Sequence, residues 1–287
     1  MLFPDHQQPQ LGQIFAEEMR TYSWSSSLEP FYSRLRATDH AILEVPDEYQ
    51  SFSTALWELC FPSISEAELW HYTELDSLAG ILKSREIWLH SLTKRMGEGE
   101  IEAFANEFDL LGLLSFDKDG RRVANELARD LFFLSLTAED EPGDFWNYGE
   151  VRLRLKIRPI NTGASLKKIS YGDGGPLKIL REFTQLRFDR SFIPWQISRQ
   201  GAFFLDSYLS WETETRLLVK RFRETTDLQM RDSEGAEAVA IPINQSNSRV
   251  DIQIVRIEAD TAASLEAAKG LLAAHADMQF PLALCTR

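Results

Sequence analysis

The sequence predicts an α+β fold, in which strands and helices are grouped rather than regularly alternated. Several short apolar runs have the two-residue periodicity of strands, and longer segments carry apolar residues at helical spacing. Irregular insertions separate the strands, whereas a parallel sheet with crossover helices would show regular alternation. The 287 residues contain no internal repeat and no low-complexity tract, so they can form one large domain or two modest ones.

The composition is ordinary for a globular protein, with 44% hydrophobic and 26% charged residues. The net charge of -13 argues against a general binder of nucleic acid or anionic membranes, although a local basic face stays compatible with it. Cys60 and Cys285 lack CxxC spacing, so we expect neither a disulfide framework nor a zinc cluster. Because we find neither a secretory signal pattern nor an apolar run of about 18 residues, we expect a cytoplasmic protein without a membrane partner.

We expect residues 1–65 to form a helical N-terminal extension that packs on an α+β main domain, residues 66–287. Three short helical segments, punctuated by prolines, follow one another in this extension: 14–19, 31–35 and 52–59. Aromatic residues in these segments indicate that the extension docks on the main domain instead of remaining disordered.

The main domain begins with a strand, a helix and a second strand over residues 69–89. Leucines at helical spacing follow Thr73, and we expect Thr73 and Asp76 to form a capping box at the start of this helix. His71, Tyr72 and Thr73 then lie at a strand-to-helix corner, where the scaffold fixes them and they can reach a cleft.

The remaining elements follow in order, beginning with a glycine-bearing loop at 92–100. We expect helices at 101–111, 123–129, 176–186, 197–209 and 262–274, and a turn at 117–120. We expect strands at 131–137, 151–157, 211–220, 239–243, 252–257 and 282–284. The strand at 151–157 has the clearest alternation, with aliphatic residues on one face and Arg152, Arg154 and Lys156 on the other. These cations are either solvated or meet a phosphate, and the pattern leaves both open.

Common catalytic motifs are absent from the sequence. It contains no GxxxxGK(S/T), no GxSxG and no HExxH pattern, and its five histidines are scattered, so we expect no metal site.

Three separate segments place polar groups at the edge of an apolar strand. They are His71-Tyr72-Thr73, then Ser135-Leu136-Thr137 with the following Trp146 and Tyr148, and Glu212-Thr213-Glu214 with Arg216. In an extended chain Glu212, Glu214 and Arg216 share one face. Paired carboxylates repel, which raises one pKa unless a cation such as Arg216 intervenes. Such a pair can stabilise a developing positive charge or hold a sugar hydroxyl, although a structural histidine and a solvated edge strand would fit the same pattern.

Several of these elements resemble, in matching order, a bacterial domain-of-unknown-function family, number twenty-nine seventy-one. Residues 69–89 resemble its Tyr-His-Tyr-Thr-like opening, and residues 133–137 resemble its Cys-Phe-Ser element. Residues 145–149 resemble its Met-Trp-x-x-Tyr element, and residues 211–217 its Glu-x-Glu-x-Arg element. The resemblance spans residues 66–287. Where the family has Asn-Asp-Pro-Phe-Glu this chain has Met-Gly-Glu-Gly-Glu, so no role of that Asn-Asp pair is carried over.

The order of a His-x-Thr element, a serine-bearing strand and a glutamate before a strand is also similar to the ADP-ribosyltransferase superfamily. That similarity implies split antiparallel β-sheets with helices packed around them, and transfer of ADP-ribose from NAD or glycohydrolysis of NAD. It implies catalytic roles for Glu214, which would hold the nicotinamide ribose hydroxyl, and for His71, which would contact a ribose. It also implies a cofactor-binding set: Tyr72, Thr73, Ser135, Trp146, Tyr148, Glu212 and Arg216.

The chemistry implied by this similarity suits the residues, because cleavage of the glycosidic bond develops an oxocarbenium-like cation that a fixed carboxylate stabilises. NAD would be a substrate, and the acceptor would be a protein or a nucleic acid. A role in bacterial defence or toxin systems is implied by the analogy alone. Two alternatives stay open, a non-catalytic nucleotide-binding or sensing module of the same fold and a protein-interaction scaffold. If the enzyme hypothesis holds, His71 and Glu214 should line one pocket within about 10 Å, the scale of a nucleotide-sized cleft.

Overall fold

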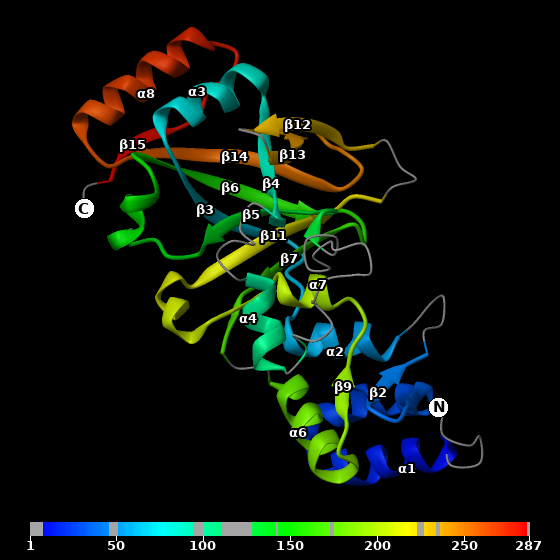
Figure 1. Ribbon diagram of the computed structural model, residues 1–287. Coiled ribbons are helices and arrows are strands. Elements are labelled where there is room, and N and C mark those ends of the chain that lie inside the picture. The colour runs from blue at the N-terminus through cyan, green and yellow to red at the C-terminus, as the bar shows by residue number, and fades with distance from the viewer. Residues whose placement is uncertain are drawn as a thin grey trace. The chain divides into compact units, whose positions relative to one another are not determined.

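The computed structural model of the chain describes residues 8–45, 51–93, 100–108, 110, 128–141, 143–172, 175–222, 227–233 and 236–285. Its combination of helices with mixed sheets confirms the predicted α+β class (Figure 1). Of the helices in these stretches, none is long and apolar enough to cross a membrane. The turn expected at 117–120, most of the helix expected at 123–129 and the core of the loop expected at 92–100 lie outside the described residues.

Contacts divide the chain into two compact units. Unit 1 lies within residues 1–62, 98–127 and 170–209, and unit 2 lies within residues 63–97, 128–169 and 210–287. The expected division into residues 1–65 and 66–287 is therefore too simple, because two later segments join the N-terminal segment in unit 1. Strand β9 (Ser191–Ile193), for example, pairs in parallel with β2 (Ala41–Glu44).

Unit 1 combines short helices with two small sheets. Its helices are α1 (Gln8–Met19), α2 (Phe52–Cys60), α4 (Glu100–Glu107), α6 (Pro176–Phe188) and α7 (Ile197–Gly201), with the 3-10 helices η2 (Ser23–Ser27) and η3 (Glu29–Arg34). Strand β1 (Leu35–Ala37) completes the β1-β2-β9 sheet, and β8 (Ser170–Tyr171) pairs with β10 (Phe204–Leu205). The rings of Phe15, Tyr32 and Phe52 pack together in the core of this unit. Three of the predicted helices therefore fall in α1, η3 and α2.

Unit 2 contains one large sheet with helices on it. Its strands are β3 (Ala67–Thr73), β4 (Glu86–Ser91), β5 (Leu131–Thr137), β6 (Val151–Pro159), β7 (Ala164–Lys168), β11 (Glu214–Lys220), β12 (Gln229–Ser233), β13 (Ala236–Pro242), β14 (Val250–Ala259) and β15 (Leu282–Leu284). Its helices are α3 (Leu75–Ser84), α8 (Ala262–Ala274) and the 3-10 helix η6 (Gly143–Tyr148), and η7 (Ser207–Glu212) leads into β11.

The sheet branches at β5, and this branching positions the site. Its main path runs β12-β13-β4-β5-β3-β6-β14-β15, and β11 pairs with β5 off this path and carries β7 on its other edge. β5 meets β4 only at Phe132 and Phe133 and meets β3 only at Thr137, whereas β11 pairs with all seven of its residues. The C-terminal end of β5 therefore lies between β3 and β11.

One face of this sheet forms the core of unit 2. The aliphatic residues of β6 that alternate with its cations are fully buried there, as the sequence pattern predicts. Helices α3 and α8 lie side by side on the sheet (Figure 1), and Leu78, Leu82, Ala268 and Leu272 face the core. The burial of this apolar face is the main favourable contribution to folding of the unit.

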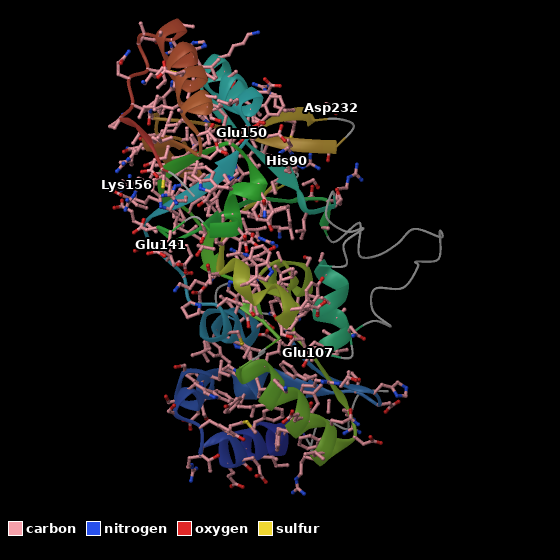
Figure 2. The ribbon with its side chains drawn as sticks, turned by 90° about the vertical axis from the view of Figure 1, so that its left-hand side faces the viewer. His90, Glu107, Glu141, Glu150, Lys156 and Asp232 are labelled. Carbon is pink, nitrogen blue, oxygen red and sulfur yellow. The ribbon has the colours of Figure 1, made fainter. Side chains whose placement is uncertain are left out.

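The cations on the opposite face of β6 are paired with carboxylates. Arg154 lies 3.0 Å from Glu68, and Lys156 lies 3.0 Å from Glu66. Both cations are part exposed, and Lys156 reaches the surface in Figure 2. Arg152 is buried instead, and it pairs with Glu258 of β14.

The predicted capping box at the start of α3 is wrong. Thr73 is the last residue of β3, where it pairs with Val151, and the helix begins at Leu75 without a capping bond from the preceding side chain. The Leu75 N–H donates to Glu150 Oε2 at 3.2 Å instead. Gly149 passes so close to the Thr73 backbone that a Cβ at position 149 would collide with it.

Two further predictions are corrected after residue 196. The expected helix at 197–209 ends at Gly201, because Phe204 and Leu205 pair with β8. The strand expected at 211–220 begins only at Glu214, since η7 extends to Glu212. Strands β7 and β12 have no counterpart among the predicted elements.

Candidate functional site

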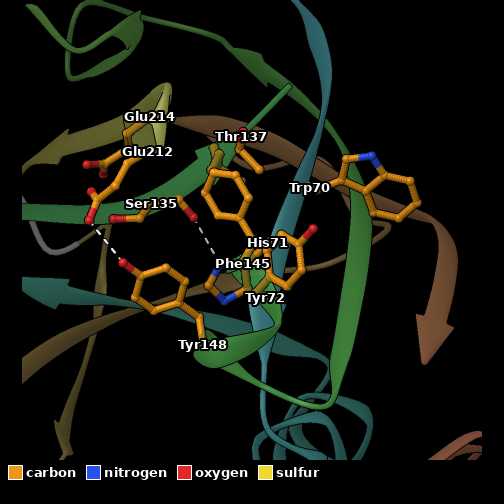
Figure 3. A pocket seen from close by; sticks show the side chains of 10 residues that line it. Trp70, His71, Tyr72, Ser135, Thr137, Phe145, Tyr148, Glu212 and Glu214 are labelled. Atoms are coloured by element: carbon orange, nitrogen blue, oxygen red, sulfur yellow. Dashed lines mark hydrogen bonds between the residues drawn. The ribbon is translucent and has the colours of Figure 1, made fainter. Parts of the chain in front are cut away.

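A pocket of about 240 Å³ opens in unit 2 where β3, β5, η6 and the start of β11 meet (Figure 3). Its lining consists of Trp70, His71, Tyr72, Ser135, Leu136, Thr137, Phe145, Tyr148, Glu212 and Glu214. His71 and Glu214 therefore line one pocket, as the enzyme hypothesis requires. Of the other predicted site residues, Tyr72, Ser135, Tyr148 and Glu212 also line it, whereas Thr73, Trp146 and Arg216 lie behind its wall.

His71 is held by the backbone of β5. Its Nδ1 lies 3.0 Å from the carbonyl oxygen of Ser135, and because a carbonyl only accepts, Nδ1 carries the proton and donates it. Burial lowers the pKa of His71, and the charge of nearby His90 lowers it further, while the bond to Ser135 opposes this shift only in part. The imidazole is therefore neutral at neutral pH and keeps Nε2 as an acceptor.

Glu214 is a buried carboxylate fixed by a buried arginine. It opens β11, and Arg216 follows two residues later on the same face, as predicted. Arg216 donates from Nε to Oε1 at 3.0 Å and from Nη2 to Oε2 at 3.1 Å, which is a bidentate pair. Glu214 is only 6% exposed and Arg216 is 1% exposed. The pair therefore fixes the orientation of the one carboxylate that reaches the pocket from the strand.

Glu212 lines the same pocket, but not from the strand position that the sequence predicts. It ends η7 instead of lying on β11, so it does not share a strand face with Glu214. Thr213 turns the chain between them with φ of +43°, a conformation that is rare for a β-branched residue and costs roughly 1–3 kcal/mol. Glu212 Oε1 then accepts a hydrogen bond of 2.9 Å from the Tyr148 hydroxyl, and Figure 3 shows the two side chains pointing toward one another.

Aromatic rings form much of the remaining wall. Tyr72 stacks on Phe145 with ring centroids 5.6 Å apart, and Trp146 meets Tyr72 edge-on from behind. At the rim, Tyr148 and Trp211 are nearly parallel with centroids 6.4 Å apart, and each is about half exposed. Phe145 and Trp211 were not among the predicted site residues, although both adjoin residues that were.

A buried arginine supports this wall from behind. Arg152 donates from Nε and Nη2 to Glu258 Oε2, at 2.9 and 2.7 Å, and from Nη1 to the Tyr72 hydroxyl at 3.1 Å. Its guanidinium carbon lies 4.0 Å from the ring centroid of Trp70. Burial alone would lower the pKa of Arg152, but its bonds to Glu258 and Tyr72 outweigh burial and raise it. Sequence reasoning missed Glu258 because it lies 106 residues from Arg152.

Comparisons of the chain with protein-family models, with curated proteins and with solved structures found no match. The family resemblance therefore stays a prediction, which rests on the four sequence elements and their order.

Proposed function

We propose that the chain binds NAD in this pocket and breaks its bond to nicotinamide, as an ADP-ribosyltransferase-like enzyme. ADP-ribose would pass to an acceptor, or to water in a glycohydrolase reaction. The observation that carries the proposal is the meeting of His71, Ser135 and Glu214 on one pocket, from three strands and in the order that the superfamily resemblance implies. The branching of the sheet at β5 also supports the split antiparallel sheets expected of that superfamily.

Glu214 would act on the reacting centre. Cleavage of the nicotinamide bond builds positive charge on the ribose, and a carboxylate that is already oriented stabilises this charge without reorganising. Arg216 supplies that orientation through its two hydrogen bonds. A well-placed electrostatic group of this kind contributes about 3 kcal/mol, or roughly a hundredfold in rate.

The other lining residues would bind and orient the substrate. Neutral His71 offers Nε2 to a ribose hydroxyl, since its Nδ1 is used by Ser135. Tyr72 and Phe145 present ring faces on which a planar nicotinamide can stack. The volume of about 240 Å³ falls below the roughly 300–1,000 Å³ of sites for drug-sized ligands, so the pocket would enclose the nicotinamide end of NAD.

Release of nicotinamide from NAD tests this function. We expect the wild-type chain to release nicotinamide and Glu214→Gln to be at least about a hundredfold slower, which is the loss of about 3 kcal/mol of stabilisation. Glu266→Gln, which alters an exposed carboxylate on α8, is the matched control and should keep the wild-type rate. The assay includes protein and nucleic-acid acceptors, and incorporation of labelled ADP-ribose would identify the acceptor on which any role in bacterial defence or toxin systems depends. Background release by the wild type with every acceptor would refute the proposal.

A non-catalytic nucleotide-binding or sensing module is the second candidate. The observation that favours it is the state of Glu214, which is almost fully buried and already held by two bonds from Arg216. Calorimetric titration with NAD and with ADP-ribose separates the two functions, because binding without nicotinamide release supports the module. The protein-interaction scaffold has no comparable observation in its favour. It would be expected to lack a cleft between His71 and Glu214, whereas both residues line one pocket.

A further inference from the structure

The aromatic surface of the pocket continues beyond its lining onto a tryptophan. Phe145 and Tyr148 line the pocket (Figure 3), and their ring centroids are 6.4 Å apart. Trp211 contacts both rings, with its centroid 5.9 Å from that of Phe145 and 6.4 Å from that of Tyr148. Phe145 and Tyr148 come from η6, whereas Trp211 comes from η7. The three rings therefore form one cluster that starts in the pocket and ends beside it.

Trp211 keeps much of its surface accessible to solvent although it belongs to this cluster. It is 49% exposed, whereas Trp70 and Trp146, which pack behind and beside Tyr72, are each 3% exposed. A tryptophan that stays half open forgoes much of the free energy that burial of its large ring would contribute. Exposed aromatic surface that is continuous with a pocket is typical of a ligand contact.

The pocket can enclose only part of the proposed substrate. Its volume of about 240 Å³ falls below the roughly 300–1,000 Å³ of sites for drug-sized ligands, and NAD is larger than most of those ligands. In the proposed function the nicotinamide and its ribose lie between His71 and Glu214, so the adenine half of the dinucleotide stays outside. The linker of riboses and pyrophosphate is flexible, and adenine can therefore settle on a flat surface next to the pocket.

The ring of Trp211 offers adenine such a surface. Stacking of a base on an aromatic side chain changes affinity by roughly 5- to 150-fold in alanine substitutions, and it requires no particular hydrogen-bond partner. Trp211 lies nearly parallel to Tyr148, at an angle of 10°. Tyr148 is itself fixed by the bond of its hydroxyl to Glu212. Because the ring is oriented before the ligand arrives, less ordering is required on binding.

We propose that Trp211 is the stacking surface for the adenine of NAD and forms a second binding subsite beside the pocket. The inference rests on the proposed function, because it takes the nicotinamide end of NAD as the occupant of the pocket. It goes further in placing the other half of the ligand and in naming the residue by which the chain distinguishes a dinucleotide from a mononucleotide.

Calorimetric titration of the full chain with two matched ligands tests the subsite. The ligands are carba-NAD and the carba analogue of nicotinamide mononucleotide, in which a methylene group replaces the ring oxygen of the nicotinamide ribose, so that the bond to nicotinamide stays intact. Only carba-NAD carries adenine. We expect the wild-type chain to bind carba-NAD at least about tenfold more tightly than the mononucleotide. This comparison does not depend on the folding of any variant.

Variants of Trp211 then assign the difference to its ring. Trp211→Ala should weaken carba-NAD by about tenfold and leave the mononucleotide within about twofold of the wild type. Trp211→Phe keeps an aromatic face and should retain most of the affinity for carba-NAD. Trp195→Ala is the matched control, because Trp195 is 48% exposed and belongs to unit 1, and it should bind both ligands as the wild type does.

The outcomes separate this inference from the proposed function. Equal binding of the two ligands by the wild type would overturn the inference. An equal loss of affinity for both ligands in Trp211→Ala would also overturn it, because Trp211 would then act through the wall of the pocket. Nicotinamide release that depends on Glu214 would still stand in either case. Conversely, a preference for carba-NAD that Trp211→Ala removes supports the inference even if no nicotinamide is released, and the chain is then the nucleotide-binding module.

Discussion

Replacement of Arg152 by methionine tests whether the buried ion pair behind the pocket supports its wall. Methionine keeps much of the length and apolar character of the arginine stem but removes the guanidinium. The variant therefore loses the bonds of Arg152 to Glu258 and to the Tyr72 hydroxyl, and the stacking on Trp70. Glu258 stays buried, at 4% exposure, without its main partner.

The expected cost follows from this uncompensated carboxylate. Removal of one partner from a buried pair typically destabilises a protein by about 3–5 kcal/mol. Arg256 still contacts Glu258 Oε1 at 2.8 Å and offsets part of the charge. We therefore expect the lower end, a loss of about 3 kcal/mol in the free energy of unfolding, or a decrease of roughly 6–12 °C in Tm.

The assay is urea unfolding of the full chain, followed by far-UV circular dichroism, with thermal unfolding as a second measurement. Arg158→Met is the matched control, because Arg158 pairs with Asp251 across the same two strands, β6 and β14, but is largely exposed. Because the Arg158 side chain is 55% exposed, solvent screens its pairing with Asp251, so Arg158→Met should cost clearly less than Arg152→Met. The double variant Arg152→Met, Glu258→Leu should be more stable than Arg152→Met alone, since it no longer buries an unpaired charge.

Two results would refute this reasoning. If Arg152→Met and Arg158→Met unfold at the same urea concentration as the wild type, the buried pair does not support the fold. The second result concerns the double variant. If Arg152→Met, Glu258→Leu has a lower free energy of unfolding than Arg152→Met, by as much as an independent core substitution costs, the unpaired charge of Glu258 is not the source of the stability loss.

Three further predictions concern the pocket and its frame. Burial lowers the pKa of His71 below its ordinary value of 6.5, so the unfolded chain takes up a proton first as the pH falls. The contribution of His71 to stability is thus full above pH 6.5 and declines as the pH falls from there toward the folded pKa. In urea unfolding between about pH 5 and 8, His71→Gln should therefore flatten the dependence of the free energy of unfolding on pH. Thr213→Pro, which forces φ near -65°, should lower the free energy of unfolding by about 3 kcal/mol or more and abolish NAD binding. Thr213→Gly should stay within about 1 kcal/mol of the wild type. Equal stability of the two variants in thermal unfolding would contradict the strained turn. Gly149→Ala should lower the free energy of unfolding by about 1–3 kcal/mol because its Cβ meets the Thr73 backbone. Gly80→Ala in α3, with open space around it, should be neutral or stabilising. Loss of stability by Gly80→Ala alone would contradict this expectation.

Several elements of unit 2 were predictable from their local sequence. Strand β5, helix α8 and strand β15 have the predicted bounds, and β6 begins at the predicted Val151. The alternation of β6 and the buried apolar run of β5 are local signals of a strand, and the alanines and leucines of α8 favour a helix. The convergence of His71, Ser135 and Glu214 was predictable for a related reason, since each lies at or near the end of a strand.

Partners that lie far away in the sequence were not predictable. Glu150 binds the first N–H of α3 in place of Thr73, and Glu258 pairs with Arg152 across β6 and β14. Neither contact leaves a periodic signal, because each depends on which strands become neighbours. The same holds for β9, which joins β2 from 150 residues later in the chain, as the pairing of Ala41 with Ser191 shows. The sequence pattern therefore predicted the N-terminal segment of unit 1 but not the later segments that join it.

The turn at Thr213 is the local feature that pattern reasoning could least anticipate. A threonine between two glutamates favours an extended chain, which would put both carboxylates on the same strand face as Arg216. The positive φ of Thr213 leaves Arg216 to Glu214 and directs Glu212 to the hydroxyl of Tyr148. One glutamate is thus held by Arg216 and the other by the Tyr148 hydroxyl, so the two carboxylates reach the pocket from different elements although they are two residues apart.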